Sequence, residues 1–206
     1  MRAVTFIFRI EAGGNLMEYR NWALSGVLIL LMLLMIGCAS TPGAPGYVTV
    51  SSSNFDSSTQ VSMEPAWLWN SPIKLELFWN TKMPDSQLVI SALIQGLETF
   101  SDGESLQFNI DGEIVGFTSI DEYTEYETVS GYAGGGIYVP PASFSYKRYI
   151  VDLDFINHLI SAEEVIVRVS LEASYAEGNF SSDAPTTARP AFRKFISKRA
   201  NVLSKP

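Results

Sequence analysis

Apolar and polar side chains alternate along several segments of the chain, as they do in strands with one buried face. The clearest segment is 73–79, where every second residue is apolar and charged residues lie between. Residues 164–171 repeat the pattern, with valines at alternate positions. Residues 88–94 are almost continuously apolar, which is typical of a central strand. A further strand is expected over 146–153, so the pattern favours a β-rich domain.

The strongest local signal is a hairpin over 106–117. Asp111 and Gly112 are the pair that a two-residue type I′ turn favours, because both turn positions need a positive φ. Five of the six side chains that this turn would pair on one face are apolar. The register that follows pairs Ile110 with Glu113, Phe108 with Val115, and Leu106 with Phe117.

Two helices are expected. Asp154 is a suitable N-cap for a short helix over 155–161. Pro190, a residue favoured at the first helical position, is expected to open a C-terminal helix over 190–203. The fold class is therefore mainly β, an antiparallel β-sandwich or an α+β domain with one short helix and a C-terminal amphipathic helix.

The C-terminal helix has one apolar and one basic side. We expect the apolar stripe to pack on the sheet and the cations to face solvent or the acidic body of the domain. The alternative is that the cations contact anionic lipid or lipopolysaccharide. The stripe consists of Phe192, Phe195, Ile196 and Leu203, and the cations are Arg193, Lys194, Lys198 and Arg199.

The chain before the strands divides into three parts. Residues 23–37 are uncharged and mostly apolar, a run shorter than the roughly 20 residues that a spanning helix needs. A stretch rich in Pro, Gly and Ser follows over 39–46 and is expected to be a flexible tether. Residues 48–62 are Ser-rich and form either an edge strand or more tether. We expect the tether over 38–60 and one domain over 61–206.

The end of the apolar run, Met35-Ile36-Gly37-Cys38, resembles the lipobox of bacterial lipoproteins. Met35 departs from the leucine usual at that position. The resemblance implies that the segment up to Gly37 is a signal peptide and that Cys38 is lipidated and becomes the mature N-terminus. Two or more acyl chains give stable membrane anchoring. Ala39 is not the aspartate that retains many such proteins at the inner membrane, which implies the outer membrane, facing the periplasm.

Two alternatives to lipidation remain for this N-terminal region, and the position of its start is a separate question. The segment could be retained as a short membrane anchor, or an ordinary signal peptidase could cut after Ala39. A signal peptide that starts at Met17 has a short head before its apolar run, whereas one that starts at Met1 has an overlong head. We therefore expect residues 1–16 to be a mis-assigned start and 17–37 to be the signal peptide.

Charge and cysteine content narrow the possible partners. Residues 38–188 contain five basic and twenty acidic residues, while 189–206 contain six basic residues and no acid. Such an acidic body argues against nucleic acid as a partner, because phosphate binding needs clustered cations. Cys38 is the only cysteine, so the chain has no internal disulfide. Lipidation would occupy this thiol.

The sequence offers little catalytic chemistry. The only histidine, His158, follows Asp154 by four residues, and the simpler interpretation is a surface histidine. Asp102-Gly-Glu104 and Asp111-Gly-Glu113, followed by Asp121 and Glu122, do not have the spacing of a calcium loop. Paired carboxylates that cleave glycans are conceivable, but no pair stands out. We expect no metal and no cofactor.

One long segment has the composition of a recognition surface. The loop 123–138 combines carboxylates, a triple glycine and four tyrosines, and tyrosine provides contact area at low entropy cost. The alternative is a hairpin extension without a binding role. The tyrosines are Tyr123, Tyr126, Tyr132 and Tyr138.

These features predict a membrane-anchored envelope lipoprotein that is a binding or structural module rather than an enzyme. Its partner would be an envelope protein or a glycan. The alternative is an envelope hydrolase that acts on glycan or peptidoglycan through paired carboxylates.

Overall fold

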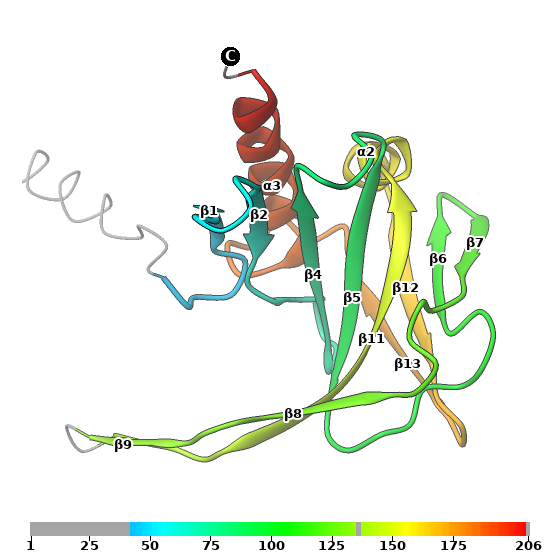
Figure 1. Ribbon diagram of the computed structural model, residues 1–206. Coiled ribbons are helices and arrows are strands. Elements are labelled where there is room, and N and C mark those ends of the chain that lie inside the picture. Colours follow the sequence, from blue (N-terminus) through cyan, green and yellow to red (C-terminus); the bar gives the residue numbers. More distant parts are fainter. Residues whose placement is uncertain (1–41, 135–136, 205–206) are drawn as a thin grey trace, which may run out of the picture. The chain divides into compact units, whose positions relative to one another are not determined.

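Antiparallel strands make up most of residues 42–134 and 137–204, which the computed structural model describes (Figure 1). The strands are β1 (Val48–Ser52), β2 (Thr59–Met63), β3 (Ala66–Trp67), β4 (Ile73–Asn80), β5 (Gln87–Gln95), β6 (Leu106–Ile110), β7 (Glu113–Phe117), β8 (Glu125–Val129), β9 (Tyr132–Gly134), β10 (Ile137–Val139), β11 (Ala142–Asp152), β12 (Val165–Ser170) and β13 (Tyr175–Asn179). The helices are α2 (Leu153–Ser161) and α3 (Ala188–Leu203). The mainly β fold class is confirmed.

The strands form two larger sheets and a small ribbon. A seven-stranded sheet has the order β1-β2-β4-β5-β11-β8, with β3 also paired to β4. A four-stranded sheet has the order β13-β12-β6-β7, and β9 pairs with β10 alone. Figure 1 shows α3 beside β1, β2 and β4, which it contacts, and β6 and β7 of the four-stranded sheet on the other side of β5 and β11.

One apolar core joins the two larger sheets and both helices. Across it, the hydroxyl groups of Tyr149 on β11 and Ser105 before β6 are 2.8 Å apart, and both residues are fully buried. Phe108 of β6 packs edge-on against Phe155 of α2, with ring centroids 5.1 Å apart. One face of the seven-stranded sheet therefore belongs to the core. We call the opposite face the outer face.

The expected strands are confirmed, together with the register of the hairpin. Residues of β4 alternate between buried and half-buried, and β5 lies between β4 and β11. Asp111 and Gly112 have φ values of 49° and 96°, as a type I′ turn requires. β6 pairs with β7 in the expected register. Local pattern and turn chemistry were sufficient for these elements.

The N-termini of both helices differ from expectation. α2 begins at Leu153 with Asp152 as its N-cap, so Asp154 lies inside the first turn and does not cap the helix. β11 runs directly into α2, and its last residue already has the extended backbone of a cap. α3 begins at Ala188, two residues before Pro190. A proline is tolerated there because the N–H groups of the first turn have no helical partner.

The division of α3 into apolar and basic sides is partly wrong. Arg193, Lys194 and Lys198 are exposed, but Arg199 is 4% exposed and packs against the core. Its guanidinium lies 4.7 Å from the Trp79 ring and donates a hydrogen bond to the backbone carbonyl of Asp85. Leu203, assigned to the apolar stripe, is 45% exposed.

The folded domain includes residues that we assigned to the tether. β1 and β2 pair at the edge of the seven-stranded sheet, so residues 48–62 are an edge hairpin. Part of the 38–60 range therefore belongs to the fold. The apolar run 23–37 and Cys38 lie outside the described residues. Within the described ranges, neither helix has the length and hydropathy that crossing a bilayer requires.

Candidate ligand-binding site

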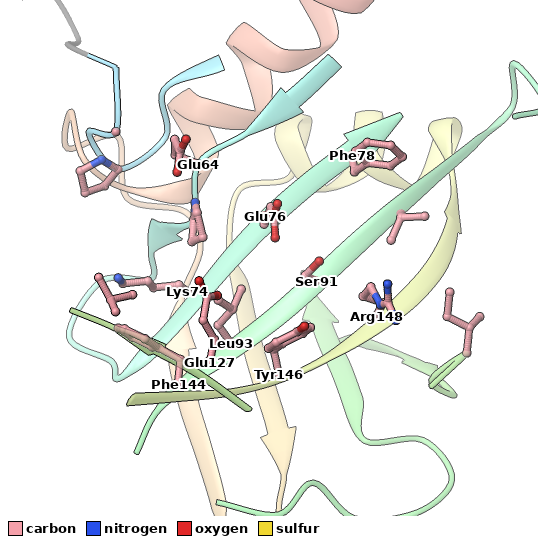
Figure 2. A pocket seen from close by; sticks show the side chains of 16 residues that line it. Glu64, Lys74, Glu76, Phe78, Ser91, Leu93, Glu127, Phe144, Tyr146 and Arg148 are labelled. Atoms are coloured by element: carbon pink, nitrogen blue, oxygen red, sulfur yellow. The ribbon is translucent and has the colours of Figure 1, made fainter. Parts of the chain in front are cut away.

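The outer face of the seven-stranded sheet carries a hollow of about 720 Å³ (Figure 2). This volume is within the range of small-molecule sites. β4, β5 and β11 form its floor, and β8 lies along one side. The residues that matter for its chemistry are Glu64, Lys74, Glu76, Glu127, Tyr146 and Arg148.

The floor follows from the alternation that predicted the strands. In β4 the side chains between the buried ones point to the outer face, and the antiparallel register places their partners beside them. Glu76 pairs with Ser91, which pairs with Arg148 on the far side of β5. The neighbouring row is Lys74, Leu93 and Tyr146. Figure 2 shows these residues crossing the three strands.

One wall of the hollow is the segment that leads into β1. Gly43 and Pro45 line the hollow beside Glu64. The N–H of Gly46 donates to the carbonyl of Glu64 over 3.0 Å, and the N–H of Glu64 donates to the carbonyl of Tyr47 over 2.8 Å. Gly46 has φ +73°, and a Cβ there would lie 2.7 Å from the Cβ of Ala191 in α3. Only glycine fits this conformation and this close approach.

Lys74 is held at one end of the hollow by two aromatic rings. Its Nζ lies 4.2 Å from the ring centroids of both Trp67 and Phe144. Burial lowers the pKa of Lys74, and the charge of Glu127 opposes that shift. Cation–π contacts of this kind stabilise an ammonium that has lost part of its water. The rings thus fix the position of this cation.

Arg148 is bound by Asp121, which precedes β8. The Arg148 Nη2 donates to Asp121 Oδ1 over 2.7 Å, and its Nε lies 3.1 Å from both carboxylate oxygens. The backbone N–H of Arg148 also donates to Oδ2 over 2.7 Å. Burial acts to raise the pKa of Asp121, but the hydrogen bonds and charge of Arg148 outweigh it and hold that pKa below its usual value. The hydrogen bonds that Arg148 donates to Asp121 likewise raise the pKa of Arg148.

Glu76 is the carboxylate at the centre of the floor. Burial raises the pKa of Glu76, and the charges of Glu64 and Glu127 raise it further, while a hydrogen bond with Ser91 and the charge of Arg148 act the other way. None of the ion pairs within residues 42–134 and 137–204 includes Glu76. The hollow therefore contains a half-buried acid that lacks a countercharge of its own.

The predicted recognition loop contributes to the hollow through other residues than its tyrosines. Tyr123 and Tyr126 are 72% and 52% exposed, and neither lines the hollow. The Tyr126 hydroxyl lies 3.2 Å from Thr99 Oγ1, in the loop between β5 and β6. Glu127 and Val129, which alternate with Tyr126 in β8, do line it. The spacing of Glu125, Glu127 and Val129 at every second position, which places them on one face of a strand, was the signal that sequence analysis did not use.

Two of the predicted site residues have strand positions but no described side chains, and one lies outside the described residues. Tyr132 is in β9 and Tyr138 is in β10, and these short strands pair with each other. Cys38, the expected lipidation site, is outside the described ranges. The 123–138 segment is thus a hairpin arm whose β8 strand pairs with β11.

The other candidate groups are scattered. His158 and Asp154 are both exposed on α2, and no hydrogen bond joins their side chains. The Asp111 carboxylate accepts the backbone N–H groups of Glu163 and Glu164, over 3.3 and 2.8 Å, which ties the hairpin turn to the start of β12. Within the described part of the chain, no three His, Cys, Asp or Glu side chains are grouped as metal ligands.

Comparisons with known proteins identify no relative of this chain. The chain matches no protein-family model, no curated protein and no solved structure. The case for a function therefore rests on the residues and geometry of the chain itself.

Proposed function

We propose that the chain is a lipid-anchored envelope protein whose β domain is a binding module, and that the module takes its ligand or partner on the outer face of the seven-stranded sheet. The observation that carries this proposal is the hollow itself. It combines about 720 Å³ of space with half-buried charged and aromatic side chains. Concave sites with a few convergent polar groups are the usual form of ligand sites.

The anchoring part of the proposal rests on the lipobox-like Met35-Ile36-Gly37-Cys38 and on the tether that follows it. Metabolic labelling with an alkyne fatty acid tests it. The wild-type chain should carry label and remain in the membrane fraction at high salt. Cys38→Ser should lose the label and should accumulate as an unprocessed precursor. Label on Cys38→Ser, or an unmodified mature N-terminus at Ser40, would contradict lipidation.

The binding part needs a test of the outer face. The full-length chain is purified in a non-ionic detergent from cells that carry either Tyr146→Ala or the control Tyr175→Ala. Tyr175 is 61% exposed on β13, in the other large sheet. Bound protein or glycan is then identified by mass spectrometry. We expect Tyr146→Ala to lose material that the wild type and Tyr175→Ala both retain. Equal recovery from all three chains would contradict binding at this face.

Hydrolysis of an envelope glycan is a second candidate, and one observation favours it. A general acid needs a pKa raised by its surroundings, and burial raises the pKa of Glu76 in the hollow. Glycosidases need a second carboxyl across the cleft, which Glu64 or Glu127 would have to provide. Purified peptidoglycan is the substrate to test. Its cleavage by the wild type and loss of cleavage in Glu76→Gln would support this candidate over simple binding.

A further inference from the structure

The groups in the hollow differ in whether they already have a partner inside the protein, and this difference indicates the charge of the ligand. Arg148 uses its guanidinium on the Asp121 carboxylate. Lys74 lies between the rings of Trp67 and Phe144, with Glu127 nearby. Both cations of the lining therefore already have a stabilising contact within the protein, Arg148 with a carboxylate and Lys74 with two aromatic rings.

The carboxylates of the hollow have weaker contacts within the protein: Glu76 has a hydrogen bond with Ser91, and Glu127 lies near Lys74. Glu64, Glu76 and Glu127 line it, and none of them takes part in an ion pair among the described residues. Glu64 and Glu127 are exposed at the rim, whereas Glu76 lies on the floor. Because a buried charge without a partner is unfavourable, a cation placed beside Glu76 would replace part of the lost hydration. The lining thus offers three carboxylates that form no ion pair among the described residues.

Apolar surface beside Glu76 suits the rest of the ligand. Phe78 and Val89 extend the floor on one side of the Glu76 row, and Tyr146 lies on the other. An alkyl stem can lie on these side chains, and the face of the Tyr146 ring can attract a positive group.

From this arrangement we infer that the hollow binds an organic cation, a protonated amine or guanidinium on an alkyl stem, with Glu76 as its counterion. The inference rests on the proposed binding function and specifies the ligand class. Such a group comes either from a free amine or from a lysine or arginine side chain of a partner protein. Lys74 lies at one end of the site, where its own ammonium already occupies the space between the rings of Trp67 and Phe144.

Isothermal titration with the full-length chain in a non-ionic detergent tests the inference. The probes are 1,5-diaminopentane, its neutral counterpart 1,5-pentanediol, and the blocked peptide acetyl-Gly-Lys-Gly-amide. We expect both amines to bind and the diol to bind at least about tenfold more weakly, since a hydrogen bond to a charged group contributes roughly 1.5–3 kcal/mol. A tighter diamine would indicate a free amine as ligand, and a tighter peptide would indicate a partner side chain.

The matched variants are Glu76→Gln and Glu113→Gln. Glu113 is an exposed acid at the start of β7, in the four-stranded sheet. We expect Glu76→Gln to weaken binding of the amines by about tenfold or more and Glu113→Gln to leave it unchanged. Equal affinity of wild type and Glu76→Gln, or a diol that binds as tightly as the diamine, would overturn the inference. The diol comparison uses only the wild type, so it does not depend on a variant that folds.

Failure of this inference can be distinguished from failure of the proposed function. If neither amine binds, but a photo-crosslinking residue at position 146 still captures a ligand, the cationic class is wrong and the binding face stands. If the amines fail and position 146 captures nothing, both are wrong.

Discussion

Glu76 shows how a single half-buried carboxyl group can make the stability of a fold depend on pH. It stands on a strand whose alternate residues build the core, and burial raises the pKa of its carboxyl group. A carboxyl group whose pKa is raised by folding binds its proton more tightly in the folded state than in the unfolded state. Its contribution therefore favours folding at low pH and is lost as the pH rises through the folded pKa.

We therefore expect Glu76→Gln to stabilise the domain at neutral pH. The gain should be about 2–4 °C in the thermal midpoint, the shift that roughly 1 kcal/mol produces in a domain of this size. At pH 4, where more of the Glu76 carboxyl groups are protonated, the difference should shrink. Differential scanning fluorimetry at both pH values measures it. A midpoint at pH 7 that falls in Glu76→Gln would show that the carboxylate is stabilised by a partner.

Arg199 has the opposite role, because its charge is buried for packing. It is 4% exposed, stacks on Trp79 and donates to the carbonyl of Asp85. Arg199→Ala removes the stacking surface and leaves a cavity, so it should destabilise the domain by about 2–4 kcal/mol. The adjacent Lys198→Ala, on the exposed side of α3, should change the stability by less than about 0.5 kcal/mol. Urea denaturation of the two variants decides this, and equal stabilities would mean that Arg199 is not part of the core.

At the scale of elements, the segment that leads into β1 contacts both α3 and the rim of the hollow, and both contacts depend on Gly46. Gly46 lies against Ala191 of α3, and its backbone pairs with Glu64 at the rim of the hollow. Gly43 has a similar positive φ, +82°, but nothing lies within 4 Å of where its Cβ would be. The pair therefore separates backbone strain from steric overlap.

We expect Gly46→Ala to lower the free energy of unfolding by about 2 kcal/mol or more, because it adds overlap with α3 to backbone strain. Gly43→Ala should lower it by only about 1 kcal/mol. Gly46→Ala should also weaken ligand binding, since it displaces the segment that pairs with Glu64 at the rim of the hollow. Chemical denaturation and titration of both variants provide the measurement. Identical effects in the two variants would rule out the close approach as the reason for glycine at position 46.

The hairpin arm allows a second experiment at this scale. Ala142 pairs directly with Val129, so replacing residues 130–141 by Asn-Gly joins β8 to β11 through a two-residue turn. The thermal midpoint should change by less than about 3 °C, because β8 keeps its pairing and the removed residues lie beyond it. If the arm is a recognition surface, capture of an envelope partner should be lost while binding in the hollow persists. Full capture of the partner by the shortened chain would contradict a binding role for residues 130–141.

Sequence patterns predicted elements well where the deciding interactions are local. The turn chemistry of Asp111 and Gly112 determined the hairpin and its register. Both helix starts were wrong because neighbouring structure decides them. β11 provides the cap of α2, and α3 begins before Pro190. Arg199 was assigned to the basic side of the helix, facing solvent or the acidic body, because its burial depends on Trp79, which is distant in sequence.

At the scale of the whole molecule, the hollow could not be predicted because its parts meet only through long-range pairing. β5 is followed in the chain by β6 and β7, which belong to the other large sheet, yet its neighbour in space is β11. That order brings Glu76, Ser91 and Arg148 into one row. In sequence they were only the polar positions of separate strands, and nothing local distinguished them from an ordinary exposed face.

An anchor at Cys38 would hold the domain close to a surface where its partners are also confined. The uneven charge of the chain, an acidic body with a basic C-terminal helix, agrees with a preference for cationic partners.

Photo-crosslinking in living cells tests whether the outer face of the seven-stranded sheet binds a ligand or partner. A benzophenone amino acid replaces Tyr146 in the hollow or, as the control, Tyr175 on β13, and the membrane-bound protein is analysed by intact mass and by peptide mapping. We expect a defined adduct from position 146 and none from position 175. An unmodified chain at position 146, or the same adducts from both positions, would contradict a binding site on the outer face of the seven-stranded sheet.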